Sequence, residues 1–248
     1  VRRQRQMCIR DSNNTEHAAS LFALKEFGNI YSRIGNPTVG ALEARLTALE
    51  DGAMCVALSS GTSAVMYSLI NIMSQGDNFI SASQLYGGTY TMFDNILPEY
   101  GINAKKVDIT DFKAVEESID EKTRAIYCET ITNPGLVVAD LTALSEIAHA
   151  NGIPLIVDAT FTTSAIQKSF DFGADIVVYS LTKWMSGHGR VIAGAVIEKG
   201  GFDWGNGNFP LYDKPDTSYG GMRWGHDLGD LGNVAYSLRL RTVPLRNL

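Results

Sequence analysis

The chain has 248 residues, of which 45% are hydrophobic and 19% charged, and its formal net charge is −6. This length and apolar content can bury the core of one large domain, or of one domain with a fragment of another. Lys and Arg are dispersed rather than gathered in the basic stripe of a nucleic-acid binder, and no apolar run approaches the ~18 residues that cross a membrane.

The two ends of the chain differ from its middle. Residues 1–12 are cationic and lack the apolar segment of a secretory signal, and we interpret them as foreign or artefactual sequence. Residues 13–35 are expected to form an N-terminal arm, and residues 36–248 a large domain. Residues 240–248 show neither a closing helix nor a polar tail, so we expect this domain to be truncated at its C-terminal end.

The first predicted helix of the domain has clear start and stop signals. Asn36 followed by Pro37 is typical of a helix start, and Gly52 is expected to end the helix. One face of this helix is expected to be apolar and to carry three leucines, Leu42, Leu46 and Leu49.

Strands and helices alternate along the rest of the chain. A strand at 53–58 is followed by a turn at 59–62 and a helix at 63–73. Further strands are predicted at 78–81, 104–107, 125–128, 153–157, 175–179 and 192–197, with helices between them, for example at 112–119 and 141–150. This order predicts an α/β fold, a mostly parallel sheet with helices on both faces.

Polar residues follow several of these strands. In the turn at 59–62, Gly61 allows close approach to the backbone at a helix start, which favours an anion such as a phosphate, although many such turns only cap a helix. Tyr86 and Asn133 follow two later strands and are able to stack on a ring and to bond a phenolic oxygen. Each is also a common turn residue.

Asp158 and Lys183 carry the strongest chemical signal. Asp158 ends the strand at 153–157, where open α/β sheets bind ligands, and an acid there can pair with a protonated ring nitrogen; alone, it would be read as a cap or loop acid. Lys183 follows the strand at 175–179. We expect desolvation to favour its neutral amine, which forms a Schiff base with an aldehyde, whereas a lone lysine usually carries surface charge.

Cysteine and histidine spacing indicates neither a disulfide framework nor a metal site. Cys55 and Cys128 lie in apolar runs and, with Cys8, are expected to be reduced in a cytoplasmic protein. No metal is expected, because the four histidines have no ligand spacing: they are His17, His149, His188 and His226.

Taken together, these segments resemble the pyridoxal-phosphate-dependent enzymes of Cys/Met metabolism, which have an aspartate-aminotransferase-like fold (fold type I). The resemblance covers about residues 13–248. It rests on six motifs in the family's order: YSRIGNPT at 31–38, SGT at 60–62, YGGT at 86–89, Glu129 with Asn133-Pro134, VDATF at 157–161, and SLTK at 180–183 with GHG at 187–189.

The resemblance implies a role for each matching residue. Lys183 would hold pyridoxal 5′-phosphate covalently and act in catalysis with Asp158, which would pair with the ring nitrogen, and Tyr86, which would stack on the ring. Asn133 would contact the ring hydroxyl. The phosphate would be held by Ser60, Gly61, Thr62, Ser180 and Thr182, and by Tyr31 and Arg33 reaching from the arm of a neighbouring subunit. A homo-oligomer, a dimer of dimers, is therefore implied.

Within the family, the Gly- and aromatic-rich segment at 200–221 is similar to an insertion of the O-acetylhomoserine sulfhydrylases, although it is also readable as an uninformative surface loop. This implies γ-replacement on O-acetylhomoserine by sulfide or a small thiol, giving homocysteine or methionine and acetate. The alternatives are a cystathionine γ-synthase, a methionine or cystathionine γ-lyase, and a non-catalytic truncated homologue. The family's substrate-carboxylate arginine belongs to a C-terminal small domain that we expect to be absent, so that role is assigned to none of Arg239, Arg241 and Arg246.

Overall fold

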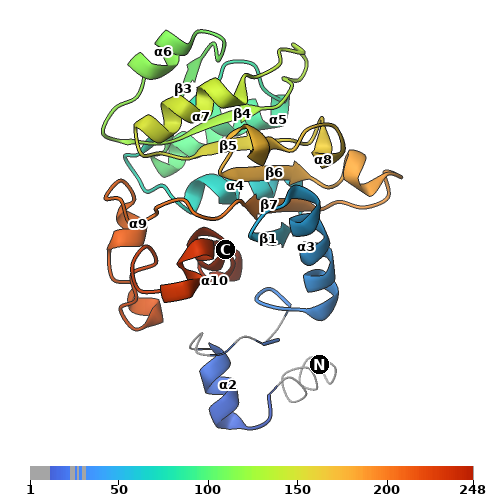
Figure 1. Cartoon of the computed structure of the whole chain (residues 1–248), viewed down its shortest axis with the longest axis vertical. Helices are drawn as coiled ribbons and strands as arrows, with labels where there is room; N and C mark the ends of the chain where they lie inside the picture. Colours follow the sequence, from blue (N-terminus) through green and yellow to red (C-terminus); the bar gives the residue numbers. More distant parts are fainter. Residues whose placement is uncertain (1–11, 23–25, 27, 30–31, 248) are drawn as a thin grey trace.

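The computed structural model of the chain describes residues 12–22, 26, 28–29 and 32–247, and its strands form one seven-stranded sheet of order β1-β7-β6-β5-β4-β2-β3 (Figure 1). The strands are β1 Met54–Leu58, β2 Asn78–Ala82, β3 Asn103–Val107, β4 Thr123–Glu129, β5 Leu155–Asp158, β6 Ile176–Ser180 and β7 Gly194–Glu198. β7 is antiparallel to both of its neighbours, β1 and β6, and the other neighbouring pairs are parallel. The mostly parallel sheet is confirmed.

Helices connect the strands, as the alternating pattern predicts. The α-helices are α2 Thr15–Phe22, α3 Pro37–Glu50, α4 Gly61–Ile70, α5 Gly87–Thr91, α6 Phe112–Glu117, α7 Leu141–Ala150, α8 Thr163–Ile166, α9 Pro210–Asp213, α10 Ala235–Thr242 and α11 Pro244–Asn247. Short π and 3₁₀ segments are η1 Met92–Ile96, η2 Leu97–Tyr100, η3 Ser169–Phe172, η4 Trp184–Ser186, η5 Thr217–Tyr219 and η6 Gly229–Val234.

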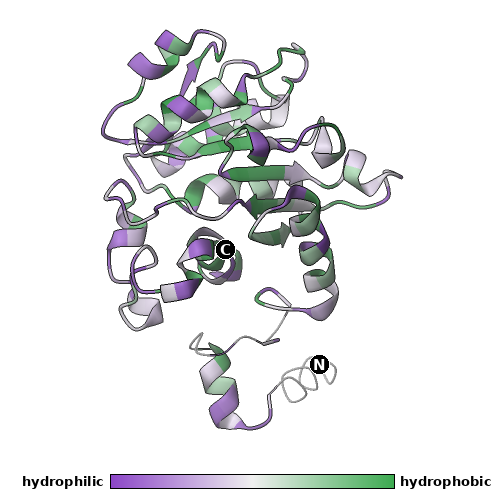
Figure 2. Ribbon diagram, in the orientation of Figure 1, coloured by the Kyte–Doolittle hydropathy of each residue, from purple (hydrophilic) through white to green (hydrophobic). Residues whose placement is uncertain are grey.

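The sheet is the centre of the hydrophobic core. Every residue of β2, β4 and β7 is buried, which requires cover on both faces of the sheet. α7 packs against β4 and β5, and α4 packs against β6 and β7. Figure 2 shows the central strands as a hydrophobic layer between helices with mixed surfaces, whereas the edge strand β3 is hydrophilic. The burial of these strands agrees with the prediction, made from the alternation of strands and helices, that helices cover both faces of the sheet.

α3 begins where the sequence predicts and differs in two details. The Asn36 side chain accepts hydrogen bonds from the N–H groups of Thr38 and Val39, which caps the helix. The left-handed residue that ends it is Asp51, with φ 56°, and not Gly52. Leu42 is exposed although Leu46 is buried, because the buried face of the helix runs through Glu43, Leu46 and Glu50 and not through the three leucines.

The turn between β1 and α4 is pressed against the sheet. A Cβ atom on Gly61 would lie 2.4 Å from the Ser180 Cβ atom, at the end of β6. A Cβ atom on Gly194, at the start of β7, would lie 2.0 Å from the Ser60 carbonyl oxygen. Glycine at both positions therefore allows the start of α4 to touch the ends of two strands. α4 starts at Gly61, two residues earlier than predicted.

The segment at 200–221 contributes buried aromatic side chains to the core and is not simply a surface loop. Trp204 stacks on Tyr212 and Tyr236, with ring centroids 5.2 and 5.1 Å apart, and Phe209 meets it edge-on. All four rings are buried. The segment thus packs its aromatic side chains against α10, which contacts β1 and β7.

The chain ends that the structure describes also differ from expectation. Residues 235–247 are mostly helical, as α10 and α11, although no closing helix was predicted. α2 lies apart from the sheet in Figure 1, and its Leu21 packs against Ile34. Arg241 links this segment to the domain, because its guanidinium donates to the Ile34 carbonyl oxygen and pairs with Glu43. The domain boundaries remain a prediction.

The buried acid Glu198 makes the stability of this fold dependent on pH. Its two oxygens accept hydrogen bonds from Trp204 Nε1 and the Ser237 N–H, and burial raises its pKa from 4.5 to about 7. Between these values the folded chain keeps a proton that the unfolded chain releases. We therefore expect the free energy of unfolding to fall as pH rises through this range, by up to about 3 kcal/mol from this group.

Urea unfolding measured from pH 4.5 to 8 checks this expectation. Glu129, whose pKa is raised in the same direction, contributes with the same sign, so the slope is compared with that of Glu198→Gln. The substitution should flatten the slope whatever it does to stability at one pH. An equal slope in both proteins would contradict the assignment.

Candidate active site

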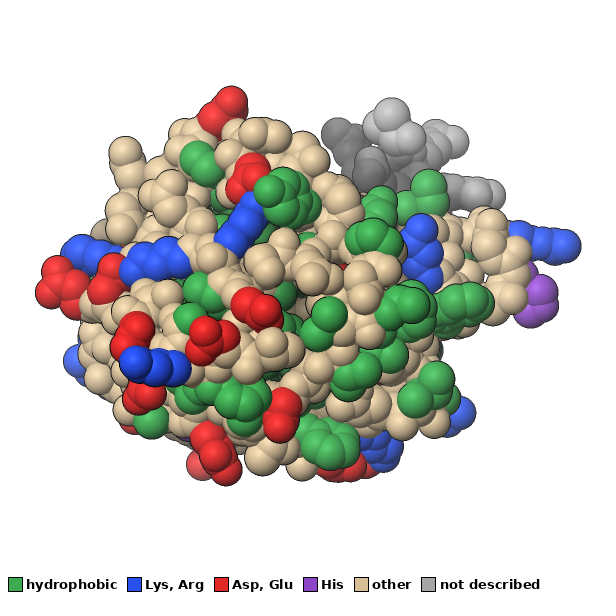
Figure 3. Space-filling view, turned by 90° about the horizontal axis from the view of Figure 1, so that it is seen from above, with side chains coloured by type: hydrophobic (Ala, Val, Ile, Leu, Met, Phe, Trp, Pro, Cys, Tyr) green, Lys and Arg blue, Asp and Glu red, His purple; other side chains and the backbone are tan. Residues whose placement is uncertain are grey.

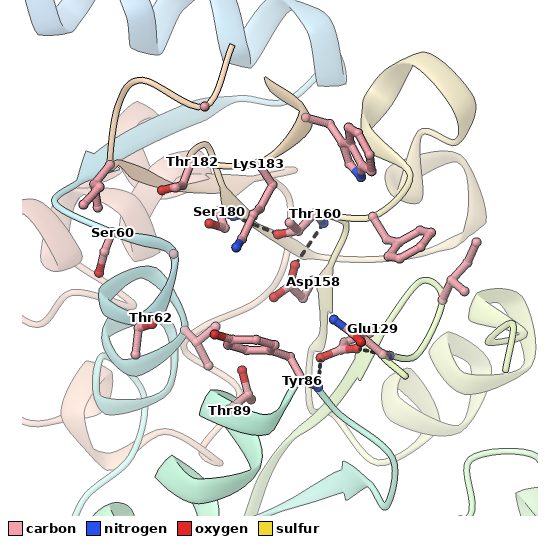
Figure 4. A pocket seen from close by; sticks show the side chains of 18 of the residues that line it. Ser60, Thr62, Tyr86, Thr89, Glu129, Asp158, Thr160, Ser180, Thr182 and Lys183 are labelled. Atoms are coloured by element: carbon pink, nitrogen blue, oxygen red, sulfur yellow. Dashed lines mark hydrogen bonds between the residues drawn. The ribbon is translucent and has the colours of Figure 1, made fainter. Parts of the chain in front are cut away.

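A cavity of about 630 Å³ opens at the carboxyl ends of the parallel strands (Figure 4). Every predicted site residue outside the N-terminal arm lines it: Ser60, Gly61, Thr62, Tyr86, Asn133, Asp158, Ser180, Thr182 and Lys183. They come from five chain segments that follow β1, β2, β4, β5 and β6. The parallel direction of these strands puts their ends on one edge, so residues up to 123 positions apart share one cavity.

One side of the cavity is the start of α4. The Ser60 hydroxyl caps this helix by accepting from the Ser63 N–H at 3.0 Å, and the first N–H groups of a helix have no partner inside it. The Thr182 hydroxyl is bonded to the backbone of Ala193. The Ser180 hydroxyl has no hydrogen-bond partner among the described residues. Free N–H groups and hydroxyls here form a site suited to an anion.

Asp158 forms the floor of the cavity. Its Oδ1 accepts from the Thr160 N–H at 2.9 Å, and its Oδ2 lies 3.4 Å from the Tyr127 hydroxyl. Desolvation raises the pKa of this carboxyl, with the hydrogen bonds opposing the rise. A cation beside the exposed carboxylate edge would offset the desolvation. Thr160 also accepts from the Ser180 N–H, so it joins β5 to β6 below the cavity.

Lys183 points into the cavity between Asp158 and Ser180 in Figure 4. The Lys183 side chain is exposed, so the prediction that this side chain is desolvated is wrong for this structure. The reason is that β6 ends at Ser180, and the three residues that follow carry the lysine out of the buried strand and over the open cavity. No ion pair involves Lys183 among the described residues, which leaves its amine available to a bound molecule.

Glu129 is a site residue to which the sequence analysis gave no role. It ends β4, is 5% exposed and lines the cavity. Its Oε1 accepts from the Tyr86 N–H at 2.7 Å and its Oε2 from the Asn133 N–H at 3.0 Å. Desolvation raises its pKa to about 7. Its position four residues before Asn133 was visible in the sequence, but the contact with Tyr86 was not.

Other cavity residues were also missed. Thr89 is buried beside Tyr86, and its neighbourhood gave no signal beyond the YGGT motif. The mouth is lined by exposed apolar side chains: Phe161, Trp184 and Ile192. Two of these follow Asp158 and Lys183 closely in the chain, so their proximity to the site was predictable, whereas their exposure was not.

The arm residues and the C-terminal arginines lie elsewhere. Tyr31 is outside the described residues, and Arg33 is in a turn that does not line the cavity. Arg239 donates to Asn71, and Arg246 donates to the Tyr219 hydroxyl. These hydrogen bonds link the two arginines to other parts of the fold.

The chemistry of the cavity fits pyridoxal phosphate. It combines an amine that points inward, an acid at the floor, an aromatic ring along one wall and a helix start for a phosphate (Figure 4). Each of these groups matches one part of the cofactor. Crowding around Gly61 shows that the backbone at the helix start is pressed against Ser180.

Other expectations concern cysteines, metals and membranes. Cys55 and Cys128 are free and buried, as predicted, while Cys8 lies outside the described residues. Over the described part of the chain, no three His, Cys, Asp or Glu side chains are grouped to hold a metal ion. In the same part of the chain, the helices are too short or too polar to cross a membrane.

Known proteins resemble this chain in sequence and in fold. An O-acetyl-L-homoserine sulfhydrylase from Leptospira meyeri is 42% identical over 95% of this chain and 54% of its own length, and a homocysteine synthase from Schizosaccharomyces pombe is 44% identical over 94% and 54%. A crystal structure from Campylobacter jejuni, described as an O-acetylhomoserine (thiol)-lyase with a pyridoxyl-lysine, has a TM-score of 0.90 and 37% identity over 95% of this chain and 58% of its own.

The chain spans about half the length of the curated relatives that it matches. A model of the family described as Cys/Met metabolism PLP-dependent enzyme matches residues 7–222. This match covers most of the chain. The chain therefore belongs to the Cys/Met metabolism PLP-dependent enzyme family.

Proposed function

We propose that this protein is a pyridoxal-phosphate-dependent transferase that catalyses γ-replacement on O-acetylhomoserine with sulfide or a small thiol, giving homocysteine or methionine and acetate. One observation carries the proposal: the predicted site residues of the sheet domain converge on one cavity, with Lys183 pointing into it. The reaction itself is supported by relatives named O-acetyl-L-homoserine sulfhydrylase and homocysteine synthase, at 42% and 44% identity.

The cavity residues would hold the cofactor at its aldehyde, its ring nitrogen, its ring hydroxyl and its phosphate. Lys183 would bind it covalently, Asp158 would pair with its ring nitrogen, and Asn133 would contact its ring hydroxyl. Tyr86 would stack on the ring. The phosphate would be held at the start of α4 by Ser60, Gly61 and Thr62, with Ser180 and Thr182, and by Tyr31 and Arg33 of a neighbouring subunit. When bound, pyridoxal phosphate supplies an electron sink for negative charge that develops on the amino-acid substrate.

The residues of the chain supply the proton transfers. The Lys183 amine, freed when substrate binds, takes the proton from the substrate Cα atom as a general base. Asp158 holds a proton at the ring nitrogen, because a carboxylate beside that nitrogen favours its charged form. The Tyr86 hydroxyl, on the wall of the cavity, moves a proton near Cγ, where acetate leaves and the thiol adds. The apolar side chains at the mouth limit access of water.

An assembly of several copies completes the proposal. In Figure 3, apolar side chains gather on the half of the surface that lies toward α8 in Figure 1. Exposed apolar residues also follow the cavity residues Asn133, Phe161 and Gly189 in the chain: they are Leu136, Val138, Ile166 and Val191. Exposed apolar groups of this kind mark association sites. We propose that this association gives a homo-oligomer, a dimer of dimers. We also place the protein in the cytoplasm, where free cysteines such as Cys55 stay reduced.

Covalent labelling tests the cofactor site directly. The protein is incubated with pyridoxal phosphate, reduced with borohydride and digested, and the pyridoxyl group is located by peptide mapping. We expect the label at Lys183, because its amine faces the cavity, and its loss in Lys183→Arg. Label scattered over surface lysines such as Lys199 and Lys113, in both proteins, would reject the site.

Product analysis tests the reaction. With O-acetylhomoserine and sulfide we expect homocysteine and acetate, and Lys183→Arg should lower the turnover by roughly 10²–10⁴-fold, the usual range for loss of a general base. The control omits the thiol. A 2-oxo acid and ammonia formed without thiol would show a γ-lyase instead, and labelled protein without either product would reject the proposed reaction.

The role of Tyr86 is tested by Tyr86→Phe, which keeps the ring and removes the hydroxyl. We expect cofactor binding, followed by absorbance, to change little, and turnover to fall by roughly 10²-fold through loss of the proton transfer. Unchanged turnover would leave Tyr86 with stacking alone.

A further inference from the structure

Glu129 connects two loops that approach the cavity from different parts of the chain. One loop leads from β2 to α5 and carries Tyr86, and the other follows β4 and carries Asn133. Each carboxylate oxygen of Glu129 accepts one backbone N–H, that of Tyr86 at 2.7 Å and that of Asn133 at 3.0 Å. One buried side chain therefore holds both loops.

The chemistry of this contact requires a carboxylate. Both partners are N–H donors, and an ionised carboxylate offers two acceptors and no donor. A glutamine would bond one loop through its oxygen and turn an NH₂ group toward the other N–H. Glu129 makes no ion pair among the described residues and is 5% exposed, so it carries a desolvation cost. The two charge-assisted hydrogen bonds oppose this cost.

The two loops also touch beyond Glu129. A Cβ atom on Gly135 would lie 1.7 Å from the Gln84 Oε1 atom, so the loops are in close contact at their outer ends as well. Tyr86 is itself 48% exposed, and Asn133 is exposed too. Packing therefore restrains the side chains of Tyr86 and Asn133 little on the solvent side. Their backbone is held on the buried side by the hydrogen bonds with Glu129.

We propose that Glu129 is a positioning residue that sets the separation of Tyr86 and Asn133 across the cavity through its two hydrogen bonds. The backbone part of this inference concerns the protein without cofactor. Its catalytic consequence rests on the proposed function, because the Tyr86 ring and the Asn133 amide would contact the cofactor together. Loss of one acceptor at Glu129 would release at least one of the two loops and so change this separation.

Amide hydrogen exchange on the cofactor-free protein tests the backbone part. At pH 8, above the Glu129 pKa of about 7, the wild-type carboxylate is ionised. In Glu129→Gln we expect exchange at Tyr86, Asn133 or both to be about tenfold faster or more, because an N–H loses a charged acceptor. Unchanged exchange at both amides would overturn the inference.

Thr132→Val provides the matched control. The Thr132 hydroxyl accepts from the Val137 N–H at 2.9 Å, so this variant removes one hydrogen bond inside the Asn133 loop and leaves Glu129 in place. Exchange should rise at Val137 and stay unchanged at Tyr86. Faster exchange at Tyr86 in Thr132→Val, equal to that in Glu129→Gln, would show general loosening of the loops and would also overturn the inference.

Two further measurements separate this inference from the proposed function. If Glu129→Gln does not fold, Glu129→Asp keeps the charge with a shorter reach, and the same faster exchange is expected; wild-type exchange in that variant would count against the proposal. Affinity for pyridoxal phosphate should fall about tenfold in Glu129→Gln and not in Thr132→Val. Faster exchange in a protein whose Lys183 is never labelled would uphold the positioning role and reject the proposed function.

Discussion

The parallel register of β4, β5 and β6 is the constraint on which the site depends. It pairs Glu129 with Asp158, which are the last residues of β4 and β5. It pairs Asp158 with Val178, two residues before the end of β6, so the ends of the three strands lie at one edge. β7 runs the other way and brings Gly194 to the same edge, where it touches Ser60. The start of α4 is thereby held against the strand ends. A shift of one residue in any of these pairings would turn the acids away from the cavity.

Two carboxyl groups at this edge are desolvated and stabilised in different ways. Asp158 keeps one edge toward the cavity and accepts from Thr160, whereas both oxygens of Glu129 are bonded to loop N–H groups. The proximity of Asp158 adds to the rise in the Glu129 pKa. Asp158 can thus pair with a bound cation, whereas Glu129 uses both oxygens to hold the two loops.

The sequence was most informative where the signal was local. Short apolar runs located the strands, because buried parallel strands are apolar on both faces, and polar residues at their ends located the cavity. Contacts between distant segments were not predictable in this way. The bond between Glu129 and Tyr86 spans 43 residues, the exposure of Lys183 depends on the open space beneath it, and the burial of Trp204 depends on Tyr236 in α10.

The antiparallel β7 has a consequence for the lysine. β6 and β7 are neighbours, so the segment at 181–193 leaves and re-enters the sheet at the same edge, with Thr182 and Ala193 bonded to each other at its base. Lys183 therefore lies one residue after Thr182, whose position is fixed by its hydrogen bonds with Ala193. The rest of the segment follows Lys183 and contains Gly187 and Gly189. Rearrangement of that distal part can reshape the entrance while the point of attachment of the amine stays where it is.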